Sequence, residues 1–215
     1  MSTDVRTHLV VIFGGRSAEH DVSCVTAAHV MRAADPRKYS ITAVGIDRDG
    51  VWHLAEGAMA ALAQGGDSIP PRLEAAGPTV SSSQIVEAVP SADGVSTTGG
   101  TVVVPLLHGP LGEDGTVQGL LELLDVPYVG AGVLASAVGM DKAMAKDVLR
   151  SYGIPQPRYV AVAEHECSPS RLDDIAADLG FPLFVKPANM GSSVGVSKAK
   201  SAEDVKRSLE IAFTY

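Results

Sequence analysis

The sequence of 215 residues contains only two cysteines, Cys24 and Cys167. Two thiols so far apart in the chain do not form the network of bridges that stabilises small secreted domains. We therefore expect both to be reduced and buried, because free cysteine usually packs as a small apolar side chain. A nucleophilic role for Cys24 is the alternative, but no neighbouring residue pattern supports it.

Long apolar runs and targeting signals are also missing. Gly, Pro or charged residues interrupt each apolar stretch within about 10 residues, which is too short for a membrane-spanning helix. The first residues, MSTDVRTHLVVIF, lack the basic region and cleavage site of a secretory signal peptide. These absences predict a cytoplasmic protein with no membrane partner.

Positive charge is in the minority and scattered. Seventeen Lys and Arg residues stand against 25 Asp and Glu, giving a net charge of -8. This argues against nucleic acid as a partner, because a phosphate backbone requires a basic face. The charge does not exclude nucleotides as ligands, since their phosphates need only a few lysines and backbone N–H groups. The composition, 46% hydrophobic and 20% charged, is that of a globular protein with one large domain or two small ones.

The first half of the chain alternates strands, Gly-rich loops and helices. Apolar, β-branched runs predict strands at residues 8–13, 39–46, 101–106 and 126–129, with a hairpin extension at 51–54. Helical spacing of apolar residues predicts a helix N-capped by Ser17, through Val22, Val25, Ala28 and Met31, and another over 116–124. Residues 55–100 carry only a weak helix signal.

This order predicts an α/β fold with a Rossmann-like parallel sheet wrapped by helices. Ligands of such sheets collect at the loops that leave the carboxyl ends of the strands. The loops at residues 14–20 and 107–115 are both expected at that edge, although they are far apart in sequence.

A second segment, beginning near Gly130, predicts a small α+β unit. Its expected elements are a helix from an Asp141 N-cap to Tyr152, a strand at 158–162, a helix opened by a capping box at Ser170, strands at 182–186 and 196–198, and a helix capped by Ser201. We therefore expect two domains, 1–130 and 131–215. Nothing follows the last helix for it to pack upon, so we expect the second domain to be incomplete.

The most specific pattern is FVKPANMGSSVGV, residues 184–196. A strand ends in Lys186, and a loop of small residues then turns back into another strand. Small residues let backbone N–H groups approach a phosphate, and the lysine adds a positive charge. The lysine precedes the glycines, unlike the lysine of a GxxxxGK[ST] loop. A plain hairpin turn with a surface lysine is the alternative from these residues alone.

Four segments, taken together in this order, resemble one family. They are FGGRSAEHDVS (13–23), LHGPLGEDGTVQGLLELLDVPYVG (107–130), GMDKAMAKDVLRSYGIPQP (139–157) with the preceding AGVLASAV, and KPANMGSSVGV (186–196). They are similar to the D-alanine–D-alanine ligases of the ATP-grasp superfamily, and the resemblance covers the chain apart from residues 55–100. It implies a Rossmann-like, pre-ATP-grasp domain at 1–130, followed by the first α+β subdomain of an ATP-grasp fold, truncated, at 131–215.

The resemblance also implies roles for residues of the first domain. Glu19 would contact the ammonium of the first D-alanine, and Ser23 would support the same pocket. His108 would lie near the carboxylate of that substrate, in a loop shaped by Glu113 and Asp114. Without the family, the structural interpretations would be favoured: Glu19 as a favourable charge at a helix N-terminus and His108 as a packed loop residue.

In the second domain, Lys142 and Lys186 resemble the two lysines that bind nucleotide phosphates in the family. Gly191, Ser193 and Gly195 would shape the loop that covers these phosphates. Ser192 resembles the serine that contacts substrate and helps to hold Glu19, so Glu19 and Ser192 are the expected catalytic residues. From the sequence alone, both lysines would be considered solvated. No metal ligand is expected before Tyr215.

The implied reaction joins two D-alanines through an acyl phosphate, with ATP and Mg²⁺ (or Mn²⁺) as cofactors, for peptidoglycan precursor synthesis. The implied assembly is a homodimer, and the 215 residues alone are expected to be inactive. Three alternatives stay open. They are a D-alanine–D-lactate or D-serine ligase, another ATP-grasp carboxylate–amine ligase, and a non-catalytic truncated module that binds nucleotide or D-alanine.

Overall fold

The computed structural model describes residues 6–81 and 100–215. The chain divides into two compact units, Met1–Ser136 and Ala137–Tyr215. This division falls slightly later than the boundary expected after residue 130. Each unit has its own hydrophobic core.

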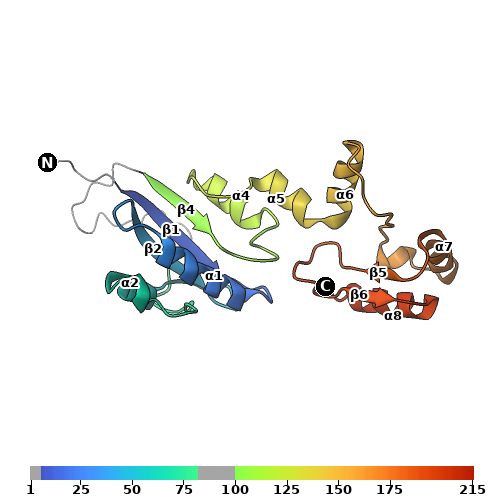
Figure 1. Ribbon diagram of the computed structural model, residues 1–215, viewed down its shortest axis with the longest axis horizontal. Helices are drawn as coiled ribbons and strands as arrows, with labels where there is room; N and C mark the ends of the chain where they lie inside the picture. The colour runs from blue at the N-terminus through green and yellow to red at the C-terminus, as the bar shows by residue number, and fades with distance from the viewer. Residues whose placement is uncertain (1–5, 82–99) are drawn as a thin grey trace. The chain divides into compact units, whose positions relative to one another are not determined.

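The first unit contains a sheet with strand order β3-β2-β1-β4 and the helices that cover it (Figure 1). Its elements are β1 (Thr7–Gly14), α1 (His20–Ala33), β2 (Tyr39–Ile46), β3 (Trp52–Leu54), α2 (Glu56–Ala63), the short 3-10 helix η1 (Gly66–Ser68), β4 (Thr101–Pro105), α4 (Thr116–Leu123) and α5 (Val133–Met140), which crosses into the second unit. Strands β2 and β4 both pair with β1 in parallel, whereas β3 returns antiparallel to β2. The expected α/β class with a parallel sheet is confirmed.

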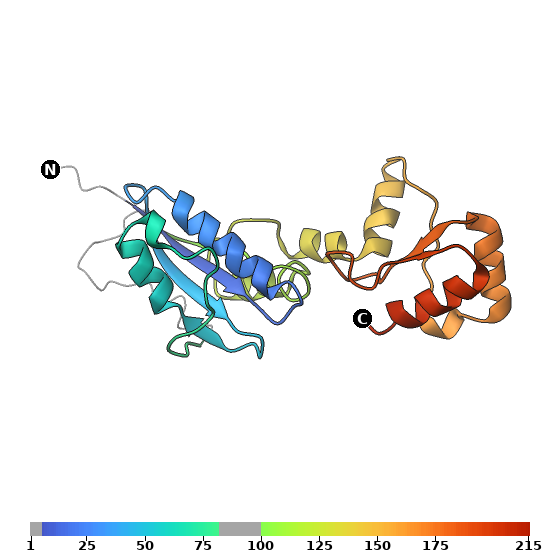
Figure 2. The ribbon, with the colours of Figure 1, turned by 60° about the horizontal axis from the view of Figure 1, so that its bottom comes forward.

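Alternation along β1 places side chains on both faces of the sheet, as expected for a strand covered on both sides. Val11 and Phe13 pack with residues of α1, α2 and β2, while Val10 and Ile12 pack with residues of β2, β4 and α4. Helix α1 lies across one face (Figure 2). The carboxyl ends of β1, β2 and β4 therefore share one edge, as the loops at 14–20 and 107–115 require.

Several local predictions in this unit were wrong. Helix α1 begins at His20 with Glu19 as its N-cap residue, so Ser17 is not the cap. Of the predicted apolar positions, Ala28 and Met31 are buried but Val22 and Val25 are exposed, and Ser23, Cys24 and Ala27 complete the buried face instead. The expected strand at 126–129 is reduced to a single parallel bridge between Val103 and Tyr128.

The second unit pairs two short antiparallel strands and packs helices against them. Its elements are α6 (Lys142–Ser151), the 3-10 helix η2 (Glu164–Glu166), α7 (Pro169–Leu179), β5 (Leu183–Val185), β6 (Ser197–Ala199) and α8 (Ala202–Ala212). Its core joins Leu172 and Ile175 of α7 to Val185 and to Val205 and Leu209 of α8.

The caps of the second unit test the sequence predictions directly. Asp141 Oδ1 accepts the N–H groups of Ala143 and Met144 at 2.9 Å, and Ser201 Oγ accepts the N–H of Asp204 at 3.2 Å, so both predicted caps are confirmed. The predicted capping box at Ser170 was wrong. Helix α7 is capped two residues earlier by Ser168 and begins with a proline, which suits the first turn of a helix. No strand forms at 158–162.

Both cysteines are free. Cys24 is buried as expected, whereas Cys167 is only half-buried, contrary to the prediction. Burial raises the pKa of both thiols, so neither has the low pKa of a reactive cysteine. Among residues 6–81 and 100–215, no helix is long and apolar enough to cross a membrane.

Candidate functional site

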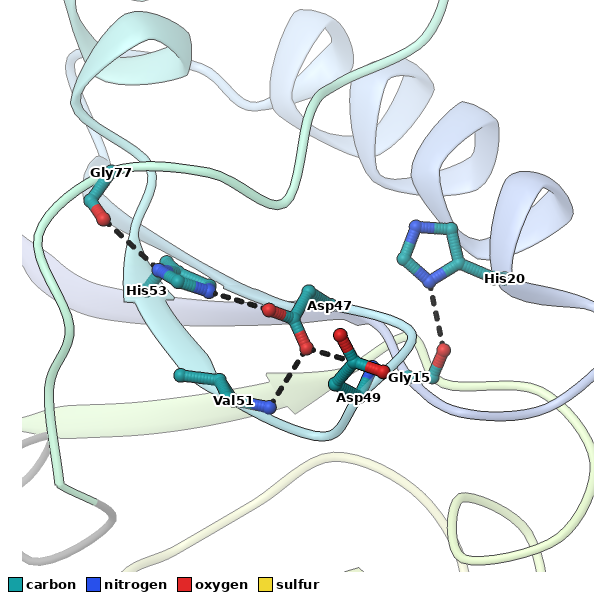
Figure 3. Close-up of polar contacts among 7 residues, drawn as sticks. All are labelled: Gly15, His20, Asp47, Asp49, Val51, His53 and Gly77. Carbon is teal, nitrogen blue, oxygen red and sulfur yellow. Dashed lines mark hydrogen bonds and ion pairs between the residues drawn. The ribbon is translucent and has the colours of Figure 1, made fainter.

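The turn that follows β1 requires glycine. Gly14 and Gly15 both have left-handed backbone, with φ of +88° and +95°. A Cβ on Gly14 would lie 2.2 Å from the carbonyl oxygen of Ile46, and the Gly15 N–H donates to that same oxygen at 2.8 Å. On the other side of the turn, Nδ1 of the His20 ring lies 2.8 Å from the Gly15 carbonyl oxygen (Figure 3). The turn is therefore fixed to the end of β2 and to the start of α1.

Ser23 joins the ends of β1 and β4 beneath this turn. Its side chain is fully buried, its Oγ accepts the Gly14 N–H at 2.8 Å, and its hydroxyl donates to the Leu106 carbonyl at 2.6 Å. The hydroxyl thus bonds to the backbone that carries both loops of the sheet edge. This geometry suits a supporting residue rather than one that touches a ligand.

Ser17 joins the loops themselves. Its hydroxyl donates to the His108 carbonyl oxygen at 2.7 Å, across 91 residues of chain, and accepts the Glu19 N–H at 3.2 Å. The expected convergence of loops 14–20 and 107–115 is therefore confirmed. This role of Ser17 was not predicted, because a serine ahead of a helix is more often an N-cap.

The side chain of Glu19 reaches the second loop. Its Oε2 lies 2.8 Å from the position that a Cβ on Gly109 would occupy. His108 is half-buried, with Nε2 at 3.4 Å from Oγ1 of Thr26 on α1. The structure thus brings the Glu19 and His108 segments together. Thr26 was also missed, since a threonine inside a helix carries no distinctive signal.

Two carboxylates shape the loop after His108, as expected. Glu113 Oε2 accepts the Gly109 N–H at 2.7 Å, and Asp114 accepts the N–H groups of Leu111 at 2.8 Å and Thr116 at 3.0 Å. Burial alone would raise the pKa of Asp114, but these hydrogen bonds outweigh burial and hold its pKa below the ordinary value. The ionised carboxylate therefore stabilises the loop ahead of α4.

A second polar network supports the turn between β2 and β3 (Figure 3). Asp47 Oδ1 accepts the N–H groups of Asp49 and Val51, both at 2.9 Å. Its Oδ2 lies 2.9 Å from Nε2 of His53, whose other ring nitrogen lies 2.9 Å from the Gly77 carbonyl oxygen. The Asp49-Gly50 turn was predicted, but the partnership of Asp47 and His53 was not.

In the second unit, Lys142 is tied to the loop at residues 187–195. Its Nζ donates to the carbonyl oxygens of Ala188, at 3.4 Å, and Met190, and its backbone N–H donates to Ala188 at 3.0 Å. Burial lowers the pKa of Lys142, and the positive charge of Lys186 lowers it further, against the opposing effect of Asp141. The two lysines are therefore close enough for their charges to interact.

The loop between β5 and β6 has an unusual backbone. Ser192 and Ser193 adopt left-handed conformations with φ of +45° and +60°, and Gly195 follows with φ of +67°. A Cβ on Gly195 would lie 2.7 Å from Cγ of Pro187 and 2.8 Å from the Tyr215 ring. Left-handed conformations cost about 1–2 kcal/mol in residues other than glycine, and such strain is concentrated at ligand-binding segments.

The two groups of predicted site residues belong to different units. Glu19, Ser23 and His108 lie in the first, and Lys142, Lys186, Gly191, Ser192, Ser193 and Gly195 in the second. The expected contact between Ser192 and Glu19 therefore stays a prediction. Within the described ranges, no group of three or more His, Cys, Asp or Glu side chains is placed to hold a metal ion.

Comparison with known proteins identifies the family. Residues 8–131 match the model of the D-Ala–D-Ala ligase N-terminus, and residues 148–215 match that of the D-Ala–D-Ala ligase C-terminus. The D-alanine–D-alanine ligase of Paenarthrobacter aurescens (strain TC1) is 46% identical over 96% of this chain, and that of Geobacillus kaustophilus (strain HTA426) is 43% identical over 98%. The chain spans 57% and 58% of the lengths of these two relatives.

Solved structures agree. The D-alanine–D-alanine ligase from Coxiella burnetii matches with a TM-score of 0.76 and 32% identity, covering 98% of this chain and 61% of its own. The VanG D-Ala:D-Ser ligase from Enterococcus faecalis matches with a TM-score of 0.75 and 32% identity, covering 98% of this chain and 60% of its own. With a family model matched over more than half of its residues, and with these relatives, the chain belongs to the D-Ala–D-Ala ligase family.

Proposed function

We propose that the protein joins two D-alanines to D-alanyl-D-alanine with conversion of ATP to ADP and phosphate, as a step of peptidoglycan precursor synthesis. One observation carries the proposal from the structure. The carboxylate segment at Glu19 and the imidazole segment at His108 are held together at the carboxyl ends of the parallel strands β1 and β4. Relatives at 43–46% identity bear the name of this activity.

The first unit supplies the pocket for the first D-alanine. D-Alanine is a zwitterion, so its pocket must present an anion to the ammonium and a donor to the carboxylate. Glu19 is the proposed partner of the ammonium, and the imidazole of His108 is the proposed donor to the carboxylate. Ser23 supports both by joining the strand ends that carry their loops.

The second unit supplies half of the nucleotide site. Two lysines whose like charges act on each other leave a local excess of positive charge, which a phosphate chain would offset. Lys142 and Lys186 are the proposed phosphate ligands. The backbone conformation of the covering loop depends on Gly191, Ser193 and Gly195. The Ser192 hydroxyl is the proposed contact to substrate and to Glu19.

Mg²⁺ (or Mn²⁺) is the proposed metal, and when bound it would neutralise charge on the phosphates. The described residues hold no metal ligand cluster, so no ligand is assigned among them. The proposed contribution of Lys142, Lys186 and the loop at residues 187–195 to the nucleotide site is lysine charge and loop backbone.

The chemistry proceeds in two displacements. A carboxylate oxygen of the first D-alanine attacks the γ-phosphorus, the bond to the β-γ bridging oxygen breaks, and ADP leaves. The deprotonated amine of the second D-alanine then attacks the acyl carbon, and inorganic phosphate leaves. The residues of this chain act by positioning the carboxylate and neutralising charge, and the covering loop excludes the water that would hydrolyse the acyl phosphate.

The proposed organisation assigns D-alanine binding to residues 1–130 and the first part of the ATP-grasp domain to residues 131–215. The proposed assembly is a homodimer. The proposed location is the cytoplasm, where ATP is available for the proposed reaction.

A D-alanine–D-serine ligase is the second candidate. The VanG D-Ala:D-Ser ligase matches with almost the same TM-score as the D-alanine–D-alanine ligase from Coxiella burnetii. Competition between D-alanine, D-serine and D-lactate at the second position separates these activities. A dominant D-alanyl-D-serine product would replace the first proposal by the second.

A coupled assay of ADP formation tests the function on the full-length gene product with ATP, Mg²⁺ and D-alanine. We expect D-alanine-dependent turnover that Glu19→Ala and Lys186→Ala each reduce by at least about a hundredfold, as for the loss of a charged transition-state contact. The exposed residues Glu56 and Lys200 offer matched controls, and Glu56→Ala and Lys200→Ala should retain activity. ATP turnover that does not respond to D-alanine, D-serine or D-lactate would refute the proposal.

A further inference from the structure

We propose that Ser17 is a positioning residue, whose hydroxyl sets the separation between the Glu19 and His108 segments and thereby the affinity for the first D-alanine. The inference rests on the proposed function, since it assigns Glu19 and His108 to the two ends of that substrate. Ser17 itself would not touch the substrate.

The bonding of Ser17 is directed at these two residues. A hydroxyl has one donor and two acceptor positions. Ser17 uses the donor on the carbonyl oxygen of His108, at 2.7 Å, and an acceptor position on the N–H of Glu19, at 3.2 Å. One side-chain oxygen therefore fixes the backbone of the proposed ammonium-binding residue relative to the backbone of the proposed carboxylate-binding residue.

Packing limits what can replace Ser17. A Cβ on Gly109 would lie 3.4 Å from Cβ and 3.5 Å from Oγ of Ser17, and 2.8 Å from Oε2 of Glu19. The serine side chain and the Glu19 carboxylate thus lie over the same glycine. A short side chain with a hydroxyl fits this place, whereas the neighbours Arg16 and Ala18 are exposed.

Ser17 and Ser23 have separable roles. Ser23 joins the ends of β1 and β4, which is a requirement of the fold itself. Ser17 joins the two loops beyond those strand ends, where a small displacement alters the spacing of the bound charges but leaves the sheet intact. Loss of the Ser17 hydroxyl should therefore affect substrate affinity more than stability, because misplacement of binding groups by about 1 Å has large kinetic effects.

An isosteric pair of variants of the full-length protein tests the inference. Ser17→Thr keeps the hydroxyl, and Ser17→Val replaces it with a methyl group at the same branched carbon. Steady-state kinetics at saturating ATP give the KM values for the first and the second D-alanine, and kinetics at saturating D-alanine give the KM for ATP. Thermal melting shows whether each variant is folded. For Ser17→Val we expect about a tenfold higher constant for the first D-alanine, with the KM for ATP unchanged within about twofold. Ser17→Thr should restore the first-D-alanine constant.

The outcomes separate this inference from the function on which it rests. A wild-type protein without D-alanine-dependent turnover would refute the function. An active wild type with equal first-D-alanine constants in the valine and threonine variants would overturn the role of Ser17 and leave the function standing. A parallel rise in the D-alanine and ATP constants would also overturn it, since it would indicate a general structural effect. Should Ser17→Val fail to fold, Ser17→Cys takes its place, because its S–H is only a weak donor.

Discussion

The imidazole of His53 and the carboxylate of Asp47 form an ion pair, with Nε2 and Oδ2 2.9 Å apart. The other ring nitrogen faces the Gly77 carbonyl oxygen, so both nitrogens face acceptors, an arrangement that favours the protonated ring. The bond to Asp47, and then that to Gly77, raises the pKa of His53, while the bond from His53 lowers the pKa of Asp47. The pair fixes the β2–β3 turn, whose Ile46 carbonyl holds Gly15 at the proposed substrate edge.

Stability should therefore depend on pH through this pair. Because the pKa of His53 is raised in the folded protein, His53 contributes to folding stability. This contribution is complete below its ordinary pKa of 6.5 and is lost as pH rises through the folded-state pKa. Because the pKa of Asp47 is lowered in the folded protein, Asp47 also contributes to folding stability. Its contribution is present above pH 3.8, its ordinary pKa, and is lost as pH falls through its folded-state pKa. The two overlap between pH 3.8 and 6.5, where the pair stabilises most.

Replacing His53 by glutamine should lower the melting temperature most within that window, and less at pH values above the folded-state pKa of His53. Melting curves of wild type and His53→Gln across the pH range measure this difference. His29→Gln, at an exposed position of α1, controls for the loss of an imidazole from the chain. If the melting temperatures of wild type and His53→Gln differed by the same amount at pH 5 and pH 9, the proposed stabilisation by the ion pair would be contradicted.

Adding a methyl group at Gly109 should weaken D-alanine binding. The new Cβ would lie 2.8 Å from Oε2 of Glu19, so the carboxylate must move, and the φ of +71° adds strain of about 1–2 kcal/mol. Gly100→Ala is a matched control, since its φ is +75° and nothing lies within 4 Å of the added Cβ. We expect both variants to lose similar stability, while only Gly109→Ala raises the KM for D-alanine, about tenfold. Equal KM values in the two variants would show that Glu19 is not displaced.

Removing the hydroxyl of Ser23 should destabilise the first unit. Ser23→Ala leaves the Gly14 N–H and the Leu106 carbonyl without this partner in a buried place, at about 1–3 kcal/mol for each group. Chemical denaturation should show a lower midpoint than for Ser151→Ala, an exposed helix position. An unchanged midpoint would mean that water or other groups replace the hydroxyl.

Replacing Lys142 by methionine should loosen the loop at residues 187–195. The variant loses the hydrogen bonds from Nζ to Ala188 and Met190, and bonds from a charged donor contribute about 1.5–3 kcal/mol. Amide exchange of peptides covering 187–195 should become at least about tenfold faster, and nucleotide affinity should fall. Lys200→Met, at an exposed site outside the loop, is the control. Exchange that is unaffected in the Lys142 variant would contradict the tether.

The structure was predicted best from the sequence where a residue forms its hydrogen bonds with residues close to it in the chain. The caps at Asp141 and Ser201 and the strands that end at Gly14 and Ile46 depend on local chemistry, and they were found. The shape of the 107–115 loop also follows from carboxylates three or four residues from the N–H groups they accept.

What the sequence could not predict depends on contacts between distant segments. The pairing of Ser17 with His108 spans 91 residues, and no local pattern distinguishes it from a helix cap. The buried face of α1 was misplaced because small residues, Ala27 and Ser23, pack closely on the sheet while Val22 and Val25 are exposed. The segment at 158–162 has strand composition but forms no strand, although Val160 and Val162 pack on the core of the second unit.

Oxygen transfer tests the central claim most directly. The full-length protein is supplied with ATP, Mg²⁺ and D-alanine carrying ¹⁸O in both carboxylate oxygens, and the inorganic phosphate is examined by mass spectrometry. An acyl-phosphate ligase must pass one carboxylate oxygen to phosphate for each dipeptide formed, so phosphate with a single ¹⁸O should appear in step with D-alanyl-D-alanine. Phosphate without ¹⁸O, or labelled phosphate without dipeptide, would contradict the proposed ligation.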